Sequence, residues 1–127
     1  NDKSLRVAAR TRMDEAVLAP GIPFLGHGQH ATFLKELHQI SQRVAGVRRF
    51  GSAALDLAWV AAGRYDGYWE RDLNSWDLAA GILLVTEAGG RVTNANGEDD
   101  VLGTGSVCAG NLEIQPQLLE RLRQAAK

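Results

Sequence analysis

The sequence predicts an α/β layered domain, in which helices lie on both faces of a mostly parallel or mixed sheet. Strand-like runs rich in Val, Leu and aromatic residues alternate with helix-like segments along the chain, an order typical of α/β folds. The 127 residues contain no internal repeat or linker, so residues 1–127 are expected to form a single domain. The helix expected over residues 76–88 is apolar almost all round, which predicts that two layers sandwich it and that a segment outside this chain covers one side.

Six short segments have the composition of strands, because Val, Leu and aromatic side chains favour extended backbone. The segment 19–23, Ala-Pro-Gly-Ile-Pro, predicts a turn, since proline fixes φ and glycine adopts unusual backbone angles. The predicted strands span residues 5–8, 16–19, 47–50, 65–70, 91–94 and 106–109.

The first predicted helix has apolar side chains at helical spacing up to Val44. Thr32 is its expected N-cap and Gly46 its expected stop. Its polar side chains are expected to face solvent: Lys35, Glu36, Gln39 and Arg43.

Three further helices follow along the chain. One begins after Ser52 as N-cap and ends at Gly63, and the helix over residues 76–88 ends at the glycine pair 89–90. A closing helix carries Pro116 in its first turn, where proline is tolerated.

Composition and charge exclude several classes of protein. The 14 basic and 15 acidic residues give a net charge of −1, which argues against nucleic acid or an acidic membrane held by bulk electrostatics. No apolar run approaches the ~18 residues that span a bilayer. Cys108 is the only cysteine, which excludes an internal disulfide and fits a reducing cytosol. The chain opens on Asn1 and has Met13 as its only methionine, so we expect a processed chain or the downstream part of a longer one.

Two carboxylates stand where α/β domains bind ligands. Glu70 ends a predicted strand, and Asp77 opens the next helix after six intervening residues. Ligands of α/β sheets bind in the crevice beyond the carboxyl ends of the strands, so both side chains are expected to face the same crevice. The alternatives are that Asp77 only caps its helix, for ~0.3–1 kcal/mol, and that Glu70 is a solvated strand end.

Gly51 and Ser52 at a helix start are a second candidate site. Free backbone N–H groups there can bind an anion or a hydroxyl, and glycine allows a close approach. The alternative is that Ser52 is an ordinary N-cap.

Other polar groups give weaker signals. His27 and His30 lie three apart in a Gly-containing segment, with His38 further along the chain. No Cys or carboxylate cluster joins them at metal spacing, so His27 and His30 are expected to be loop histidines. Cys108 lies in an apolar run and is expected to be buried. The acidic turn 98–100 lacks the residue order of a calcium loop. Three arginines are too few for a nucleic-acid patch and are expected to make ion pairs or subunit contacts: Arg48, Arg49 and Arg64.

The stretch RRFGSAALDLAWVAAGRYDGYWERDLNSWDLAAGILLVTEAGG resembles the C-terminal half of the inositol monophosphatase family. Its segment WDLAAGILLVTEAGG is similar to that family's second fingerprint. The similarity extends from about Leu5 to the end of the chain and is closest to bacterial members. The resemblance implies the C-terminal half of the inositol monophosphatase and fructose bisphosphatase-like fold, a layered α/β/α sandwich.

The resemblance also implies roles for five residues. Asp77 matches the family aspartate that binds the second metal and touches the substrate ring. Gly51, Ser52 and Ala53 match the segment whose backbone holds inositol hydroxyls, and Glu70 matches the glutamate that binds a ring hydroxyl. The implied cofactor is Mg²⁺, which prefers the oxygen ligands that a carboxylate supplies. No other residue of this chain is expected to take part in catalysis.

The family's first fingerprint, Asp-Pro-Ile-Asp-Gly-Thr, is absent from this chain. That segment holds most of the metal cluster, and one aspartate cannot build a two-metal site. The resemblance therefore implies the C-terminal half of a longer enzyme and predicts that the 127 residues alone are inactive.

The implied activity is that of a magnesium-dependent, lithium-sensitive phosphatase of inositol monophosphates. The expected partners are a small phosphorylated polyol and a second subunit in a homodimer; the expected location is the cytoplasm, with no membrane and no direct nucleic-acid partner. A related phosphatase of fructose bisphosphate, histidinol phosphate or an adenosine bisphosphate is one alternative. A non-catalytic interaction module is another, since bacterial members of the family are also implicated in RNA-related regulation.

Overall fold

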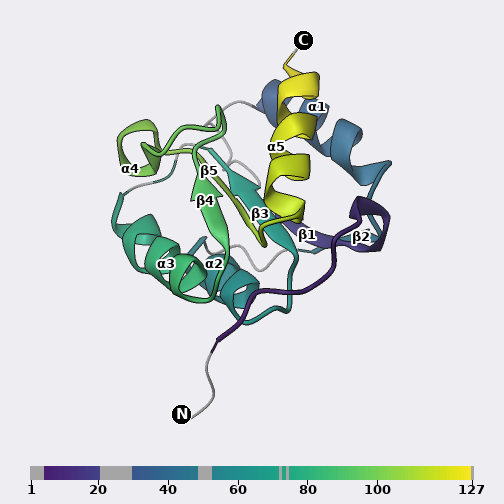
Figure 1. The fold of residues 1–127 in the computed structure, drawn as a ribbon. Helices are drawn as coiled ribbons and strands as arrows, with labels where there is room; N and C mark the ends of the chain where they lie inside the picture. Colours follow the sequence, from purple (N-terminus) through teal and green to yellow (C-terminus); the bar gives the residue numbers. More distant parts are fainter. Residues whose placement is uncertain (1–4, 21–29, 49–52, 72, 74, 127) are drawn as a thin grey trace.

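The computed structural model describes residues 5–20, 30–48, 53–71, 73 and 75–126. Within these residues the strands form one mixed sheet in the order β2-β1-β3-β5-β4 (Figure 1), which confirms the predicted α/β class. The strands are β1 (Val17–Pro20), β2 (Gly46–Val47), β3 (Gly67–Glu70), β4 (Arg91–Thr93) and β5 (Val107–Gly110). The helices are a 3₁₀ turn (Met13–Glu15), α1 (His30–Ser41), α2 (Ala53–Ala61), α3 (Ser75–Glu87), α4 (Val101–Thr104) and α5 (Ile114–Ala125).

Three neighbouring strands of the sheet run in the same direction. β1 pairs in parallel with β2 on one side and with β3 on the other. β5 is antiparallel to both β3 and β4, so that Glu70 lies opposite Val107. The carboxyl ends of β1, β2 and β3 therefore meet at one edge of the sheet.

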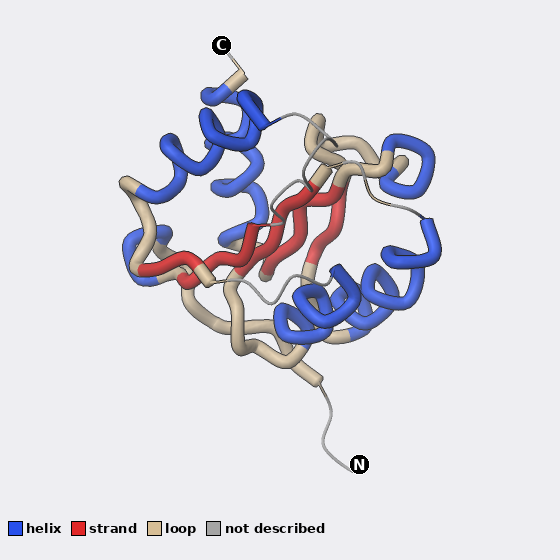
Figure 2. The backbone as a smooth tube through the Cα atoms, turned by 180° about the vertical axis from the view of Figure 1, so that it is seen from behind, coloured by secondary structure: helices blue, strands red, loops and turns tan. Residues whose placement is uncertain are grey.

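Helices cover both faces of the sheet, as predicted. Figures 1 and 2 show α2 and α3 on one face and α1 and α5 on the other. β3 shows how the sequence fills both layers, because side chains of a strand alternate between faces. Tyr68 belongs to the core under α2 and α3, whereas Trp69 belongs to the core under α1 and α5.

The helix α3 packs closely against α2 and also contacts β4 and α4, but part of its surface stays exposed. A Cβ atom at Gly81 would lie 2.8 Å from the Cβ atom of Leu57, so glycine permits this approach of the two helices. On the outer side, Leu83 is 60% exposed and Leu84 is 36% exposed. The described residues therefore leave this face of α3 uncovered, and the second layer expected over it stays a prediction.

The N-terminal segment departs most from the prediction. Residues 5–8 form no strand; their backbone is bound individually by other elements. The N–H of Val7 donates to the carbonyl of Ala88 at 3.1 Å. The Asn111 amide donates to the carbonyls of Ala8 and Arg10, both at 2.8 Å. Single hydrogen bonds to the backbone of Ala88 and to the side chain of Asn111 thus take the place of a strand ladder.

The predicted element boundaries hold with small shifts. α1 begins at His30, so Thr32 lies inside the helix, and Gly46 belongs to β2 instead of stopping the helix. β3 starts at Gly67 instead of residue 65, and Pro20 of the predicted turn ends β1. Gly63, with φ +78°, ends α2 as predicted.

The closing helix and the remaining strands also match their predictions within a few residues. Pro116 occupies the first turn of α5. The rest of the turn over residues 21–23, and residues 49–50 of the predicted third strand, lie outside the described residues. Of the helices described, none combines the length and apolar character that a membrane span requires.

Candidate functional site

The predicted site segments follow the carboxyl ends of β2 and β3, the two strands that flank β1. α2 begins at Ala53 after β2, and α3 carries Asp77 in its first turn after β3. α2 and α3 then pack side by side on one face of the sheet. The topology therefore brings the starts of both helices and the end of β3 to one edge, as expected for an α/β ligand site.

The structure describes the side chain of only one of the five predicted site residues. Gly51 and Ser52 lie outside the described residues, as do the side chains of Ala53 and Asp77. The N-cap at Ser52 and the choice between a capping and a metal-binding role for Asp77 therefore remain predictions.

Glu70 is the predicted site residue whose side chain is described. It is half-buried at the last position of β3, and the hydroxyl of Tyr68 donates a hydrogen bond to its Oε1 atom. The two residues are two apart in the strand, so their side chains leave the same face. The fully buried Tyr68 thus orients the carboxylate, which argues against a freely solvated strand end. The sequence analysis did not identify Tyr68. The alternation of side chains along a strand could have placed Tyr68 on the same face as Glu70.

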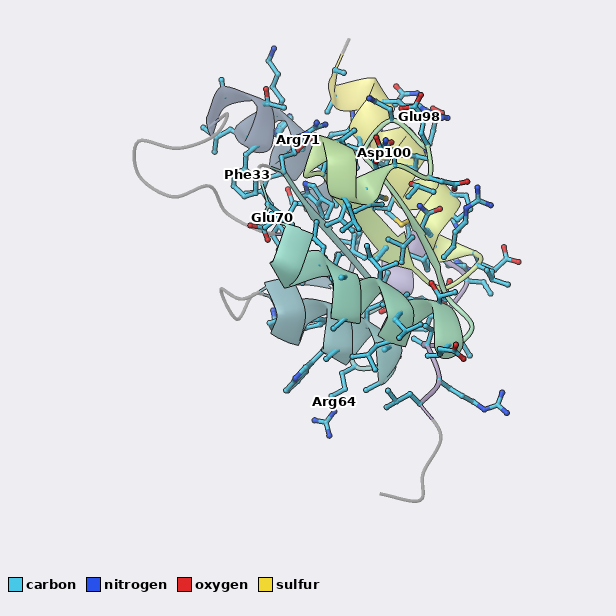
Figure 3. All side chains as sticks on the ribbon, turned by 90° about the vertical axis from the view of Figure 1, so that its left-hand side faces the viewer. Phe33, Arg64, Glu70, Arg71, Glu98 and Asp100 are labelled. Atoms are coloured by element: carbon cyan, nitrogen blue, oxygen red, sulfur yellow. The ribbon has the colours of Figure 1, made fainter. Side chains whose placement is uncertain are left out.

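A buried carboxylate holds the connection that follows Glu70. Glu36 of α1 is 2% exposed and accepts hydrogen bonds from Nε and Nη2 of Arg71, at 3.0 and 2.7 Å. The indole Nε1 of Trp69 also donates to Glu36, at 3.3 Å. The prediction that Glu36 faces solvent is therefore wrong, because two donors from β3 and its end satisfy the carboxylate inside the protein. Figure 3 shows Glu70 and Arg71 at the end of β3 beside α1.

A second anchor fixes the same connection from the side of α4. The N–H of Leu73 donates to the carbonyl of Gly105 at 2.9 Å. Gly105, with φ +71°, ends α4, and the carboxylate of Asp100 caps the start of this helix through the N–H of Gly103 at 2.9 Å. The acidic turn 98–100 thus supplies a helix cap. The segment between Glu70 and Asp77 is consequently held at both Arg71 and Leu73.

The described donors do not form a metal centre by themselves. Among the residues with described side chains, no three His, Cys, Asp or Glu residues gather closely enough to hold an ion. His30 begins α1, so the expectation that it is a loop residue is wrong, and His27 lies outside the described residues. His38 is exposed on α1 beside Gln42. Cys108 is fully buried, as predicted, and this burial raises the pKa of its thiol.

The remaining charged residues have local structural roles. The guanidinium of Arg64 lies 4.8 Å from the ring centroid of Trp59 and makes no ion pair among the described residues. Arg64 precedes β3 and lies at the opposite edge from Glu70 (Figure 3). Arg48 donates to a backbone carbonyl, and Arg49 lies outside the described residues. At the same edge as Arg64, the fully buried Asp66 accepts from Arg10 at 2.8 Å.

Known proteins resemble this chain over nearly all of its length. The model of the inositol monophosphatase family matches residues 1–127. An inositol-1-monophosphatase of Caulobacter vibrioides is 61% identical over 125 residues, which cover 98% of this chain and 49% of that protein. A protein of Pseudomonas aeruginosa named Nus factor SuhB is 42% identical over 97% of this chain and 46% of its own length.

Solved structures show the same arrangement. The extragenic suppressor protein suhB of Bartonella henselae superimposes with a TM-score of 0.94 at 49% identity, over 98% of this chain and 48% of that one. The inositol monophosphatase of Anabaena gives a TM-score of 0.89 at 36% identity, over 98% of this chain and 51% of that one. The chain thus spans about half the length of the relatives that it matches. The match of the family model over every residue, together with the shared fold, shows that the chain belongs to the inositol monophosphatase family.

Proposed function

We propose that residues 1–127 form one α/β domain, the substrate-binding half of a magnesium-dependent phosphatase that converts inositol monophosphates to inositol and phosphate. The observation that carries this proposal is the family match over the whole chain. The topology supports it, because the segments that resemble the family's substrate-binding residues follow neighbouring parallel strands at one edge.

Each proposed role is the one that the family resemblance implies, and the chemistry of the residue supports it. The backbone N–H groups of residues 51–53 bind ring hydroxyls, and Glu70, oriented by Tyr68, accepts a hydrogen bond from another hydroxyl. Asp77 holds a cation and contacts the ring. Magnesium, when bound, supplies an activated water and neutralises the charge that develops on the leaving oxygen. The remaining metal ligands come from the half of the family's length that this chain does not span.

The 127-residue chain alone is expected to hydrolyse no phosphate monoester and to bind magnesium only weakly. The reason is that Asp77 is its one proposed metal ligand, whereas a two-metal reaction needs several. The assay uses inositol 1-phosphate with millimolar magnesium and compares the chain with the full-length protein that carries it. Turnover by the chain near ~1–10³ s⁻¹, the usual enzyme range, would contradict this division of the site.

Glu70→Gln in the full-length protein is expected to weaken substrate binding. Losing a hydrogen bond from a charged group costs ~1.5–3 kcal/mol, or about one to two decades in kcat/KM. The magnesium dependence should stay nearly constant, because Glu70 touches the ring and not the metal. Steady-state kinetics over a range of magnesium concentrations test this, with the exposed Glu87→Gln as a matched control. A large shift in the magnesium requirement of Glu70→Gln contradicts the ring-binding role.

The substrate is proposed from the family name of the relatives. The test compares kcat/KM for four phosphorylated compounds. Full-length protein is assayed with inositol 1-phosphate, fructose bisphosphate, histidinol phosphate and adenosine bisphosphate, with and without lithium. A higher kcat/KM for inositol 1-phosphate, together with inhibition by lithium, supports the proposal. A higher kcat/KM for another of these compounds would contradict the proposed substrate but would agree with the proposed reaction, hydrolysis of a phosphate ester.

Self-association is proposed from the outer face of α3. Leu83 and Leu84 are exposed there, and contiguous exposed apolar surface favours association. Light scattering of the 127-residue chain is expected to show a dimer or larger species. The substitution Leu83→Gln should shift its size distribution towards monomer. A monomer at high concentration that binds no hydrophobic dye contradicts this expectation.

A non-catalytic interaction module is the second candidate function. The observation that favours it is the similarity to proteins named Nus factors, such as the 42% identical relative from Pseudomonas aeruginosa. A direct nucleic-acid partner is not proposed, since the net charge is −1. Both functions place the protein in the cytoplasm. A full-length protein without turnover on any of the four phosphorylated compounds would favour the module over the enzyme.

A further inference from the structure

A pocket of about 560 Å³ opens at the edge of the sheet opposite Glu70. It is lined by residues 11–14, which precede and enter the 3₁₀ turn before β1, and by residues 42–44, which precede β2. The α5 side chains of Gln117 and Arg121 complete its wall. Because the first two segments lead into β1 and β2, the pocket lies at the amino ends of these strands. None of the predicted site residues contributes to it.

The charge of the pocket is unbalanced. Three arginines line it, Arg12, Arg43 and Arg121, against a single carboxylate, Asp14. Arg12 and Asp14 neutralise each other through two hydrogen bonds at 3.0 and 2.6 Å. Arg43 donates through Nε to the amide oxygen of Gln39 at 3.0 Å. Neither Arg43 nor Arg121 takes part in the ion pairs formed within the described part of the chain, so no carboxylate there pairs with either guanidinium.

An apolar floor lies between these arginines. Met13 is 9% exposed and is anchored in the core under α1 and α5, while Val44 is half-buried beside it. The amide of Gln117 donates to the carbonyl of Thr11 at 2.8 Å and so ties the segment before the 3₁₀ turn to α5. This part of the wall is thus held before any ligand arrives, which lowers the entropy cost of binding.

We propose that this pocket binds an acidic peptide segment that carries one apolar side chain. Arginine binds carboxylates through paired N–H groups, and the flexible thioether of a methionine adapts to varied apolar side chains. The volume falls within the range of about 300–1,000 Å³ that ligand pockets occupy, and it exceeds the needs of one small anion. Two uncompensated arginines are too few to follow a nucleic-acid backbone. The pocket is proposed independently of the phosphatase reaction.

The only methionine of the chain makes this proposal directly measurable, because a ¹³C-methyl label reports on Met13 alone. The probe is a short synthetic peptide of glutamates around one central leucine, titrated into the chain and followed by the Met13 methyl resonance. We expect a saturable shift whose apparent Kd rises with salt. The double variant Arg43→Glu/Arg121→Glu should weaken binding at least tenfold. Arg91→Glu, an exposed residue of β4, is the matched control and should change the Kd by less than twofold.

Three results would overturn the proposal. The first is the absence of a saturable shift at millimolar peptide. The second is unchanged binding by Arg43→Glu/Arg121→Glu, or by Arg43→Gln/Arg121→Gln if the charge-reversed variant does not keep the wild-type circular dichroism. The third is a larger and tighter response to inorganic phosphate or to an oligouridine RNA than to the peptide, which would assign the pocket to an anion or to RNA instead. The contribution of the apolar floor has its own test. A peptide with the central leucine replaced by serine should bind several-fold more weakly, and equal binding would contradict a role for the apolar floor.

Discussion

Asp77→Asn in the full-length phosphatase is expected to lower kcat by about 10²–10³-fold, the scale seen when one electrostatic stabiliser of a transition state is removed. Asparagine keeps the shape of the side chain but removes the charge that holds a cation. The magnesium concentration needed for half-maximal activity should therefore rise as well. The measurement is kcat as a function of magnesium, together with a melting curve of each protein. Asp99→Asn, which removes an exposed carboxylate before α4, controls for the change in net charge.

The capping alternative predicts a different outcome for the same variant. Asparagine is accepted at helix starts, so stability would fall by at most ~1 kcal/mol while activity stayed nearly intact. An active Asp77→Asn protein with unchanged magnesium dependence would remove the metal role. It would also remove the main site assignment, since Asp77 is the chain's one proposed metal ligand.

Glu36→Ala is expected to cost about 2–4 kcal/mol of unfolding free energy, towards the lower end of what breaking a buried ion pair costs. The substitution leaves Arg71 and the indole N–H of Trp69 without their acceptor. The cost stays below the largest values because the Arg71 side chain is 28% exposed and can reach water. Urea denaturation of the wild type and the variant gives the difference directly.

Two further variants separate the causes of that loss. Glu36→Gln keeps a hydrogen-bond acceptor and removes the charge, so an intermediate loss is expected. Lys35→Ala changes the exposed neighbour on the same helix and should alter stability by no more than ~0.5 kcal/mol. A loss of that small size for Glu36→Ala would mean that the Glu36–Arg71 pair does not hold the connection after β3.

The alternation of strands and helices was predictable because each element carries its own local signal. The apolar run of α3 and the terminating Gly63 depend on neighbours in sequence, and their positions agree with the structure within a residue or two. Residues 5–8 misled the prediction for the same reason. Their Val- and Leu-containing composition favours a strand, but Val7 is bound by Ala88 and Ala8 by Asn111. Both partners are distant in sequence, and no local pattern contains them.

The candidate site divides along the same line. The position of Glu70 beyond a strand end followed from the sequence, because strand ends are local features. The partners that orient it and hold the next segment did not. Glu36 lies on the polar face of a helical pattern, and only the distant Trp69 and Arg71 reveal why this carboxylate is buried. Sequence periodicity describes what each face is made of, whereas burial of a charge depends on what the fold brings against it.

The strand order has a consequence for how the molecule is assembled during synthesis. β5 is made after all the other strands, yet it lies between β3 and β4, and β4 has no other partner in the described sheet. A nascent chain that has emerged only as far as residue 106 therefore carries β4 as an unpaired edge and leaves one side of β3 open. Such unpaired edges are prone to aggregation. β5 thus completes the sheet in a late step, because it fills the gap between β3 and β4. A ribosome paused before Val107 would leave the unpaired edges of β3 and β4 exposed to aggregation.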